Sequence, residues 1–289
     1  FETLGWWAGW KRKPQEPPPG PSPEAESEGP FLVYLTGVAG FSGDFLSRRE
    51  LGFLDRMRQR LPQASIVQDV FPFSANNNPL DGDRLFRWLW VWLHRWRLKM
   101  PNNVFDVLII VRNVAQTLVS ADPRYGPVYN QGVARELANS LRRQGYAEGR
   151  ALHLVCYSGG AQIAIGAAPY LKEILNSPIQ VLSLGGVITD DPGMQAVDQL
   201  IDFKGSRDHI MPTLGWLLFP GRWRPLFFSP WNRMRRQGRI SFRVAGPMAH
   251  IGGSDYFSRK ATVADGRCYG EVSADLVVES IADFQAKLT

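Results

Sequence analysis

Apolar residues follow two different patterns along the chain after residue 30. A continuous apolar run, typical of a strand buried on both faces, predicts a strand over residues 31–35, and short, mainly apolar segments predict strands over residues 64–71, 151–156, 179–184, 199–203 and 240–244. Apolar positions at helical spacing predict helices over residues 44–61, 84–99, 104–120, 128–144, 161–175 and 272–287. Strands that alternate with helices favour a mostly parallel sheet with helices on both faces.

The first 30 residues follow neither pattern. Residues 14–30 are rich in Pro, Glu, Ser and Gly, which predicts an extended, solvated linker. Residues 1–13 place aromatic side chains before three cations, an order typical of the membrane–water interface, and the chain begins at Phe1 rather than Met. An exposed peptide is an equally good interpretation. We expect an N-terminal segment over residues 1–30 and one domain over residues 31–289.

A serine lies between a predicted strand and a predicted helix, in the sequence Cys156-Tyr157-Ser158-Gly159-Gly160. A sharp strand-to-helix turn lifts a serine hydroxyl out of a sheet, and it needs small residues two positions to either side. Gly160 meets this requirement, whereas Cys156 stands where glycine is usual. The positive end of the following helix would stabilise a developing oxyanion. The pattern predicts a nucleophile at Ser158.

A carboxylate and a histidine follow later strands. Asp208 lies in the loop after strand 199–203, and His250 lies in the loop after strand 240–244. The order nucleophile, acid, histidine is that of a hydrolase triad. Other candidates remain in the sequence: Asp190, Asp191 or Asp202 as the acid, His94, His153 or His209 as the base, and Cys156 as an alternative nucleophile placed within a strand.

These three spaced motifs resemble the α/β-hydrolase superfamily over residues 31–288, without pointing to a subfamily. The resemblance implies an α/β-hydrolase fold and a Ser158–Asp208–His250 triad. It also implies an oxyanion hole made by the backbone N–H of Gly159 and that of Val38 or Ala39, although Thr36-Gly37 stands where many relatives have His-Gly. The implied activity is hydrolysis of an ester, thioester or amide through an acyl-enzyme. The alternative is a catalytically silent module of this fold that binds a lipid or protein partner.

Tryptophan and arginine are clustered. All ten tryptophans lie in three segments, each with cations nearby, and seven arginines but no acidic residue lie between Asp208 and Asp255. We expect helical cap insertions at about residues 80–121 and 211–239 that present Trp88, Trp92, Trp216 and Trp223 to the substrate. Aromatic and basic side chains together suit an anionic membrane surface. Packing of the two segments on each other is the alternative.

Composition adds few constraints on partners. The net charge of +6 and pI near 9.5 favour anionic partners, and we expect an acyl ester or lipid substrate and an anionic membrane surface rather than nucleic acid, for which no motif is present. No metal-ligand or dinucleotide spacing occurs, so we expect no metal and no cofactor. No run of about 18 apolar residues is present. We expect peripheral membrane association or an anchor before residue 1, with the cytoplasmic side favoured, and no oligomeric state is implied.

Overall fold

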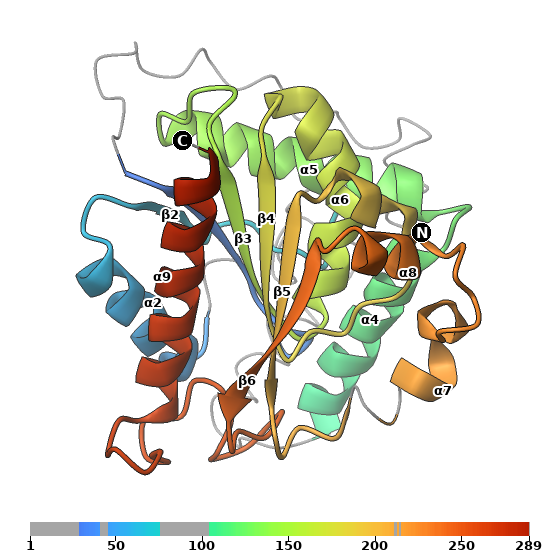
Figure 1. Cartoon of the computed structure of the whole chain (residues 1–289). Helices are drawn as coiled ribbons and strands as arrows, with labels where there is room; N and C mark the ends of the chain where they lie inside the picture. Colours follow the sequence, from blue (N-terminus) through green and yellow to red (C-terminus); the bar gives the residue numbers. More distant parts are fainter. Residues whose placement is uncertain (1–28, 41–45, 76–103, 211–212, 214, 289) are drawn as a thin grey trace.

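Six parallel strands form one sheet in the order β2-β1-β3-β4-β5-β6 (Figure 1). The computed structural model describes residues 29–40, 46–75, 104–210, 213 and 215–288. The strands are β1 (Phe31–Leu35), β2 (Ser65–Val67), β3 (Leu152–Tyr157), β4 (Ile179–Leu184), β5 (Gln199–Gly205) and β6 (Ile240–Gly246). The parallel sheet predicted from the apolar runs is confirmed.

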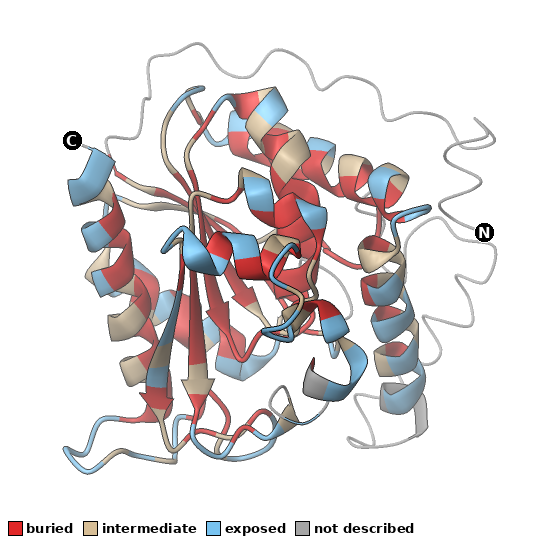
Figure 2. Cartoon of the chain, turned by 45° about the vertical axis from the view of Figure 1, so that its right-hand side comes forward, coloured by how far each residue is buried: buried red, intermediate tan, exposed pale blue. Residues whose placement is uncertain are grey.

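Helices cover both faces of this sheet. The helices are α2 (Arg48–Arg60), α4 (Val104–Ala121), α5 (Gly126–Arg143), α6 (Gly160–Leu175), α7 (Trp216–Leu218), α8 (Pro230–Arg236) and α9 (Tyr269–Leu288), with 3-10 turns at Pro192–Ala196 and Pro220–Arg222. Helices α2 and α9 lie side by side on one face, while α4, α5, α6 and α8 lie on the other (Figure 1). Strands β1, β3 and β4 are therefore buried almost throughout, whereas β6 at the edge of the sheet is partly exposed (Figure 2).

Each face of the sheet has its own apolar core. One core joins Ile109, Val133, Ile163 and Trp231 from the helices of the α5–α6 face. The other joins Phe53 of α2 and Val277 of α9 to strand residues of the opposite face. Strands β3 and β4 contribute to both cores, because successive side chains of a strand point to opposite faces. This double burial explains why their sequences are mainly apolar, with His153, Gln180 and Ser183 buried among the apolar side chains.

Several predicted elements differ from the observed ones by one to three residues at an end, and two differ by four residues. The helix predicted over residues 44–61 begins at Arg48, because Ser47 has extended backbone angles and its hydroxyl accepts a hydrogen bond from the N–H of Glu50. The strand predicted over residues 64–71 ends at Val67. Phe71 is buried by a turn, in which the N–H of Ser74 donates to its carbonyl, rather than by strand pairing.

The helix predicted over residues 84–99, with Trp88, Trp92 and His94, lies outside the described residues, as does the linker before residue 29. Helix α4, which falls within the predicted cap insertion of residues 80–121, packs against α5 and α6. In the part of the chain that the structure describes, no helix combines the length and apolar character needed to cross a bilayer.

Candidate active site

Ser158 occupies a strained turn between β3 and α6. Its φ angle is +50°, in the left-handed region that side chains larger than glycine seldom adopt. The turn is possible because Gly160 lies against the end of β1, where a Cβ atom would be 2.6 Å from the carbonyl oxygens of both Leu35 and Thr36. Cys156 is fully buried in β3 and fits the position where glycine is usual. The local backbone thus has the form of a nucleophile elbow.

Three side chains from distant parts of the sequence form one hydrogen-bonded chain. Ser158 Oγ lies 2.9 Å from His250 Nε2, and His250 Nδ1 lies 2.9 Å from Asp208 Oδ2. They follow β3, β6 and β5 respectively, so they meet at the carboxyl edge of the parallel sheet. All three are buried, with exposed fractions of 5–7%. The structure therefore brings together the three residues that the sequence motifs selected.

Hydrogen bonds keep Asp208 ionised despite its burial. Burial raises the pKa of this carboxyl, but hydrogen bonds from His250, from the Tyr256 hydroxyl and from the N–H of Ile210 outweigh that effect, so the pKa lies below its ordinary value. Tyr256 Oη donates to Asp208 Oδ2 at 2.8 Å and accepts the N–H of Gly205 at 2.8 Å. Asp208 is thus an anion held in a fixed orientation toward His250.

Tyr157 orients His250 from the other side. The two rings are stacked, with centroids 5.7 Å apart and an interplanar angle of 23°. The hydroxyl of Tyr157 also donates to the backbone carbonyl of His250. Because Tyr157 directly precedes Ser158 in the chain, the strand that presents the serine also fixes the imidazole.

The alternative acids have other contacts. Asp202 accepts a hydrogen bond from Ser183 and pairs with Lys204. Asp191 caps a 3-10 turn through the N–H of Gly193 and accepts a hydrogen bond from Gln162. The carboxylate of Asp190 lies against Gly221, on the segment after β5. None of these contacts involves His250.

The alternative bases and nucleophile are also placed elsewhere. His153 is buried in β3 and its Nδ1 is 2.7 Å from Gln180 Oε1, whereas His209 is exposed. The thiol of Cys156 lies 3.5 Å from the carbonyl oxygen of Leu154, and burial raises its pKa far above the ordinary value. A protonated, buried thiol is a poor nucleophile.

The loop after β1 borders the nucleophile turn. The side chain of Val38 packs so closely on Gly159 that a Cβ atom there would be 2.6 Å from Val38 Cγ1. A turn closed by the N–H of Gly40 and the carbonyl of Gly37 shapes this loop. The backbone of Val38 and the amino-terminal end of α6 therefore lie beside Ser158, where an oxyanion hole is required.

Two buried side chains brace this loop. Asn113 of α4 donates from Nδ2 to the carbonyl oxygens of Val38 and Gly40, both at 2.8 Å. Glu50 of α2 accepts hydrogen bonds from the hydroxyls of Tyr34 and Thr36 on the other side. Thr36, which stands where His is usual in this loop, is thus tied to α2.

Sequence reasoning missed Tyr256, Tyr157 as an orienting residue, Asn113 and Glu50. Their partners lie 48, 93, 75 and 14 residues away respectively, and no spacing pattern marks such pairs. Asn113 gave one signal: it is a polar residue close to the apolar stretch 107–111 of α4, and a polar side chain buried there needs a hydrogen-bond partner.

The predicted substrate-contacting tryptophans are only partly described. Trp88 and Trp92 lie outside the described residues, and α7 begins at Trp216. Trp223 is 38% exposed and its carbonyl oxygen accepts a hydrogen bond from Asn232. Their contact with substrate stays a prediction. Among the described residues, no group of His, Cys, Asp or Glu side chains is placed to hold a metal ion.

Comparison with known proteins gives matches to structures only. No protein-family model matches the chain, and no curated protein matches it significantly. Similar solved structures include m3DLH, with 11% identity, a TM-score of 0.50, and coverage of 90% of this chain and 87% of that one. A dienelactone hydrolase-like promiscuous phosphotriesterase from metagenomic libraries matches with 10% identity, a TM-score of 0.47 and coverage of 90% and 86%.

A poly(3-hydroxybutyrate) depolymerase from Bordetella parapertussis matches with 14% identity, a TM-score of 0.43, and coverage of 90% of this chain and 80% of that one. At such low identity, structural likeness concerns the fold alone. The match to m3DLH, together with the six-stranded parallel sheet and the turn at Ser158, shows that the chain has the α/β-hydrolase fold.

Proposed function

We propose that this protein is a serine hydrolase that cleaves carboxylic esters through an acyl-enzyme on Ser158. The observation that carries the proposal is the continuous chain of hydrogen bonds from Ser158 through His250 to Asp208. A second support is the positive φ of Ser158, because such strain is kept where it serves a site. In this hydrogen-bonded chain Ser158 can act as the nucleophile, His250 as the general base, and Asp208 as the carboxylate that orients the imidazole.

Acylation begins with His250 as the general base. As Ser158 Oγ attacks the carbonyl carbon of the ester, His250 Nε2 takes the hydroxyl proton, and the carbonyl oxygen becomes an oxyanion. The N–H groups of Gly159 and Val38 stabilise that oxyanion, aided by the positive end of α6. The imidazolium then gives its proton to the leaving alkoxide, and the alcohol departs as the ester C–O bond breaks.

Deacylation repeats these steps with water. His250 takes a proton from water, the hydroxide adds to the acyl carbon, and the proton is returned to Ser158 Oγ as the carboxylic acid leaves. Throughout, Asp208 accepts the hydrogen bond of His250 Nδ1 and stabilises the imidazolium. Because the pKa of Asp208 is lowered, its carboxylate remains ionised while the imidazole of His250 accepts and returns a proton.

We further propose an acyl ester or lipid-like ester as the substrate, with a thioester as a chemical equivalent. The same intermediate serves both, since each releases its leaving group from a tetrahedral adduct on Ser158. The apolar and aromatic residues of the segment after Asp208 support an apolar acyl group. Short and long p-nitrophenyl esters separate an esterase from a lipase preference.

The test is covalent labelling with a fluorophosphonate probe, which forms a bond only to an activated serine. We expect the parent protein to be labelled and Ser158→Ala to be unlabelled, with esterase activity reduced on the order of a million-fold. Ser206→Ala, which removes an exposed serine from the loop of Asp208, is the matched control and should be labelled normally.

Absence of labelling in the folded parent protein, in buffer and in the presence of detergent or liposomes, would contradict the proposal. That result would favour the alternative of a catalytically silent module that binds a lipid or protein partner. Equal labelling of the parent and Ser158→Ala would show that another side chain reacts.

A further inference from the structure

Large apolar side chains are exposed together on the segment between β5 and β6. Leu217 and Leu218 of α7 are 64% and 58% exposed, and Phe227 and Phe228, which precede α8, are 65% and 62% exposed. We call residues 217–236 the basic–aromatic segment. Single exposed apolar residues are common on protein surfaces, but a concentration of them marks an interaction site.

The same stretch of the chain carries arginines without acidic partners among the described residues. Arg222 packs over Trp231, Arg239 binds backbone carbonyls, and Arg243 pairs with Asp283, so three of the seven arginines between Asp208 and Asp255 have structural contacts. The other four are exposed, and within the described residues none forms an ion pair: Arg224, Arg233, Arg235 and Arg236. The excess positive charge of the segment is therefore not neutralised locally.

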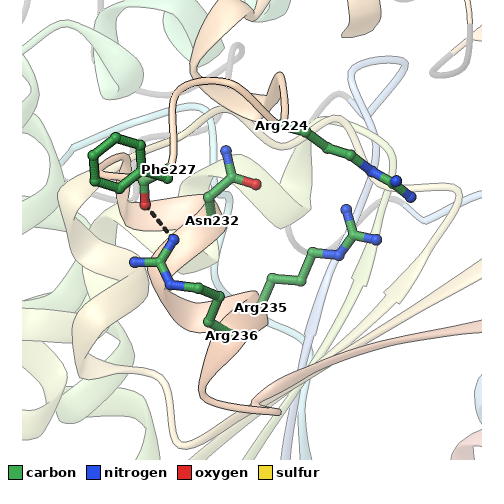
Figure 3. A pocket seen from close by; sticks show the side chains of 5 residues that line it. All are labelled: Arg224, Phe227, Asn232, Arg235 and Arg236. Carbon is green, nitrogen blue, oxygen red and sulfur yellow. Dashed lines mark hydrogen bonds between the residues drawn. The ribbon is translucent and has the colours of Figure 1, made fainter.

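The arginines and an exposed ring line the same hollow. An open pocket of about 330 Å³ is lined by Arg224, Phe227, Asn232, Arg235 and Arg236, and Figure 3 shows these five side chains. The guanidinium of Arg236 donates to the carbonyl oxygen of Phe227, which fixes the helix against the phenylalanine loop. Guanidinium groups bind phosphate oxygens in bidentate geometry, so this hollow suits a phosphate group.

Hydrogen bonds within the loop that precedes α8 fix the backbone around Phe227 and Phe228, which leaves both side chains exposed. Asn232 is buried and donates from Nδ2 to the carbonyl oxygens of Trp223 and Leu226, at 2.7 and 3.0 Å. Ser229 caps α8, and Trp231 anchors the helix in the core. The residues on either side of the two phenylalanines are therefore fixed by hydrogen bonds and packing, whereas Phe227 and Phe228 themselves are exposed to solvent.

We propose that the basic–aromatic segment docks on an anionic lipid bilayer, with the phenylalanines and leucines in the interface and the arginines on lipid phosphates. This chemistry matches a surface that is both apolar and negatively charged. A free anion would use the arginines alone. Single-stranded nucleic acid would stack bases on the aromatic rings, but Leu217 and Leu218 offer no ring for stacking and do suit acyl chains.

The proposal does not rest on the hydrolase function, since binding is measured without turnover. The full chain is sedimented with vesicles of phosphatidylcholine, and with vesicles in which phosphatidylglycerol replaces half of it. We expect binding to the anionic vesicles only, and release at high salt as the charges are screened. A single-stranded oligonucleotide is tested in parallel by gel shift.

Two pairs of substitutions separate charge from apolar contact. Arg224→Gln with Arg235→Gln should weaken vesicle binding about 25-fold, because each arginine near an anionic surface contributes about fivefold. The charge-preserving pair Arg224→Lys with Arg235→Lys should restore most of it. Phe227→Ser with Phe228→Ser should weaken binding about tenfold or more. Arg58→Gln, which removes an exposed arginine from α2 across the sheet, is the matched control and should bind like the parent.

Several outcomes would overturn the proposal. The first is no sedimentation of the folded protein with anionic vesicles. The second is vesicle binding that both pairs leave unchanged, which would assign it to another surface. Loss of vesicle binding with the arginine pair but not with the phenylalanine pair would mean that the phenylalanines do not enter the interface, which contradicts the proposed docking. Oligonucleotide binding that both pairs abolish, without vesicle binding, would assign the surface to nucleic acid. Thermal unfolding of every variant checks that each is folded.

Discussion

Asp208 and Asp202 are both buried carboxylates near the carboxyl end of β5, but they contact different groups. Asp208 accepts from His250, whereas Asp202 is held by Ser183 and Lys204. We expect Asp208→Asn to lower kcat by about 10⁴-fold, since the amide would favour the wrong tautomer of His250. Asp202→Asn should retain activity. Steady-state kinetics with a short p-nitrophenyl ester measures both, and the opposite ranking would assign the acid to Asp202.

Tyr256 is a positioning residue for Asp208. Tyr256→Phe keeps the buried ring but removes the hydroxyl that donates to Asp208 Oδ2. Because that bond favours the ionised carboxylate, its loss raises the pKa of Asp208, so the carboxylate that orients the imidazole is protonated at a higher pH. The acid limb of the kcat profile should therefore move to higher pH, with KM little changed.

The control for Tyr256→Phe is Tyr146→Phe, which removes a hydroxyl bonded to Ser177 and to the carbonyl of Arg150, with no contact to the triad. It should lower the free energy of unfolding by about 1 kcal/mol and leave the pH profile in place. An unchanged pH profile in folded Tyr256→Phe would mean that its hydroxyl only stabilises the fold.

At the scale of single residues, the sequence predicted a site residue where the backbone conformation at that residue demands a particular neighbouring residue type. Ser158 stands out because its turn needs a small residue at Gly160, and the chain order then selects Asp208 and His250. The supporting contacts of Tyr256 and Asn113 left no such mark. A hydrogen bond between residues 48 or 75 positions apart depends on where the sheet places two loops, which the local pattern does not encode.

Helix α4 braces the loop after β1 through one side chain. Asn113 is fully buried, and its Nδ2 binds the carbonyls on either side of Ala39. We expect Asn113→Ala to lower the free energy of unfolding by about 2 kcal/mol, because two partly buried carbonyls lose their donor. If Val38 supplies an oxyanion donor, kcat and the rate of fluorophosphonate labelling should also fall, by about tenfold or more.

Asn130→Ala is the matched variant for this prediction. Asn130 is likewise buried, on α5, but its amide binds Ser120 rather than the loop after β1. Asn130→Ala should lower the free energy of unfolding by about as much as Asn113→Ala does, but kcat and the rate of fluorophosphonate labelling should not change. Identical kinetics for the two alanine variants would show that Asn113 acts on stability alone.

At the scale of helices and strands, boundaries were predictable where the burial of an element determines which of its positions are apolar. The bounds of β4 follow directly from its mainly apolar sequence, because a strand covered on both faces has no solvent-facing polar side; Gln180 and Ser183 are its buried polar residues. The short edge strand β2 was predicted too long, since Phe71 is buried by a turn. The start of α2 depended on the Ser47 cap, a local signal that the apolar spacing alone did not resolve.

At the scale of the whole molecule, the strand order places the three loops of the site at one edge. Strands β3, β5 and β6 lie within four neighbouring strands, so the loops that follow them converge. The alternation of strands and helices predicted the parallel sheet but not which strands are adjacent. Adjacency was expected instead from the order serine, aspartate, histidine in the sequence. That order resembles the α/β-hydrolase superfamily, and the resemblance implies the strand arrangement of that superfamily.

The stability of the whole fold should depend on one buried histidine in mild acid. His153 lies in the central strand β3, and burial lowers its pKa from 6.5 to about 4, despite the bond to Gln180. Between these values the unfolded chain binds a proton that the folded protein does not. The free energy of unfolding should therefore fall as pH falls from 6.5 to about 4, by about 3 kcal/mol from this residue.

His153→Gln removes this titration while its amide N–H replaces the donor to Gln180. Urea unfolding across that pH range should show a smaller decrease for His153→Gln than for the parent. The difference isolates His153 from buried carboxylates such as Asp202, whose raised pKa acts in the opposite direction. His209→Gln, at an exposed histidine, should follow the parent. Parallel curves for the parent and His153→Gln would mean that the imidazole gains a proton in the folded state as readily as in the unfolded chain.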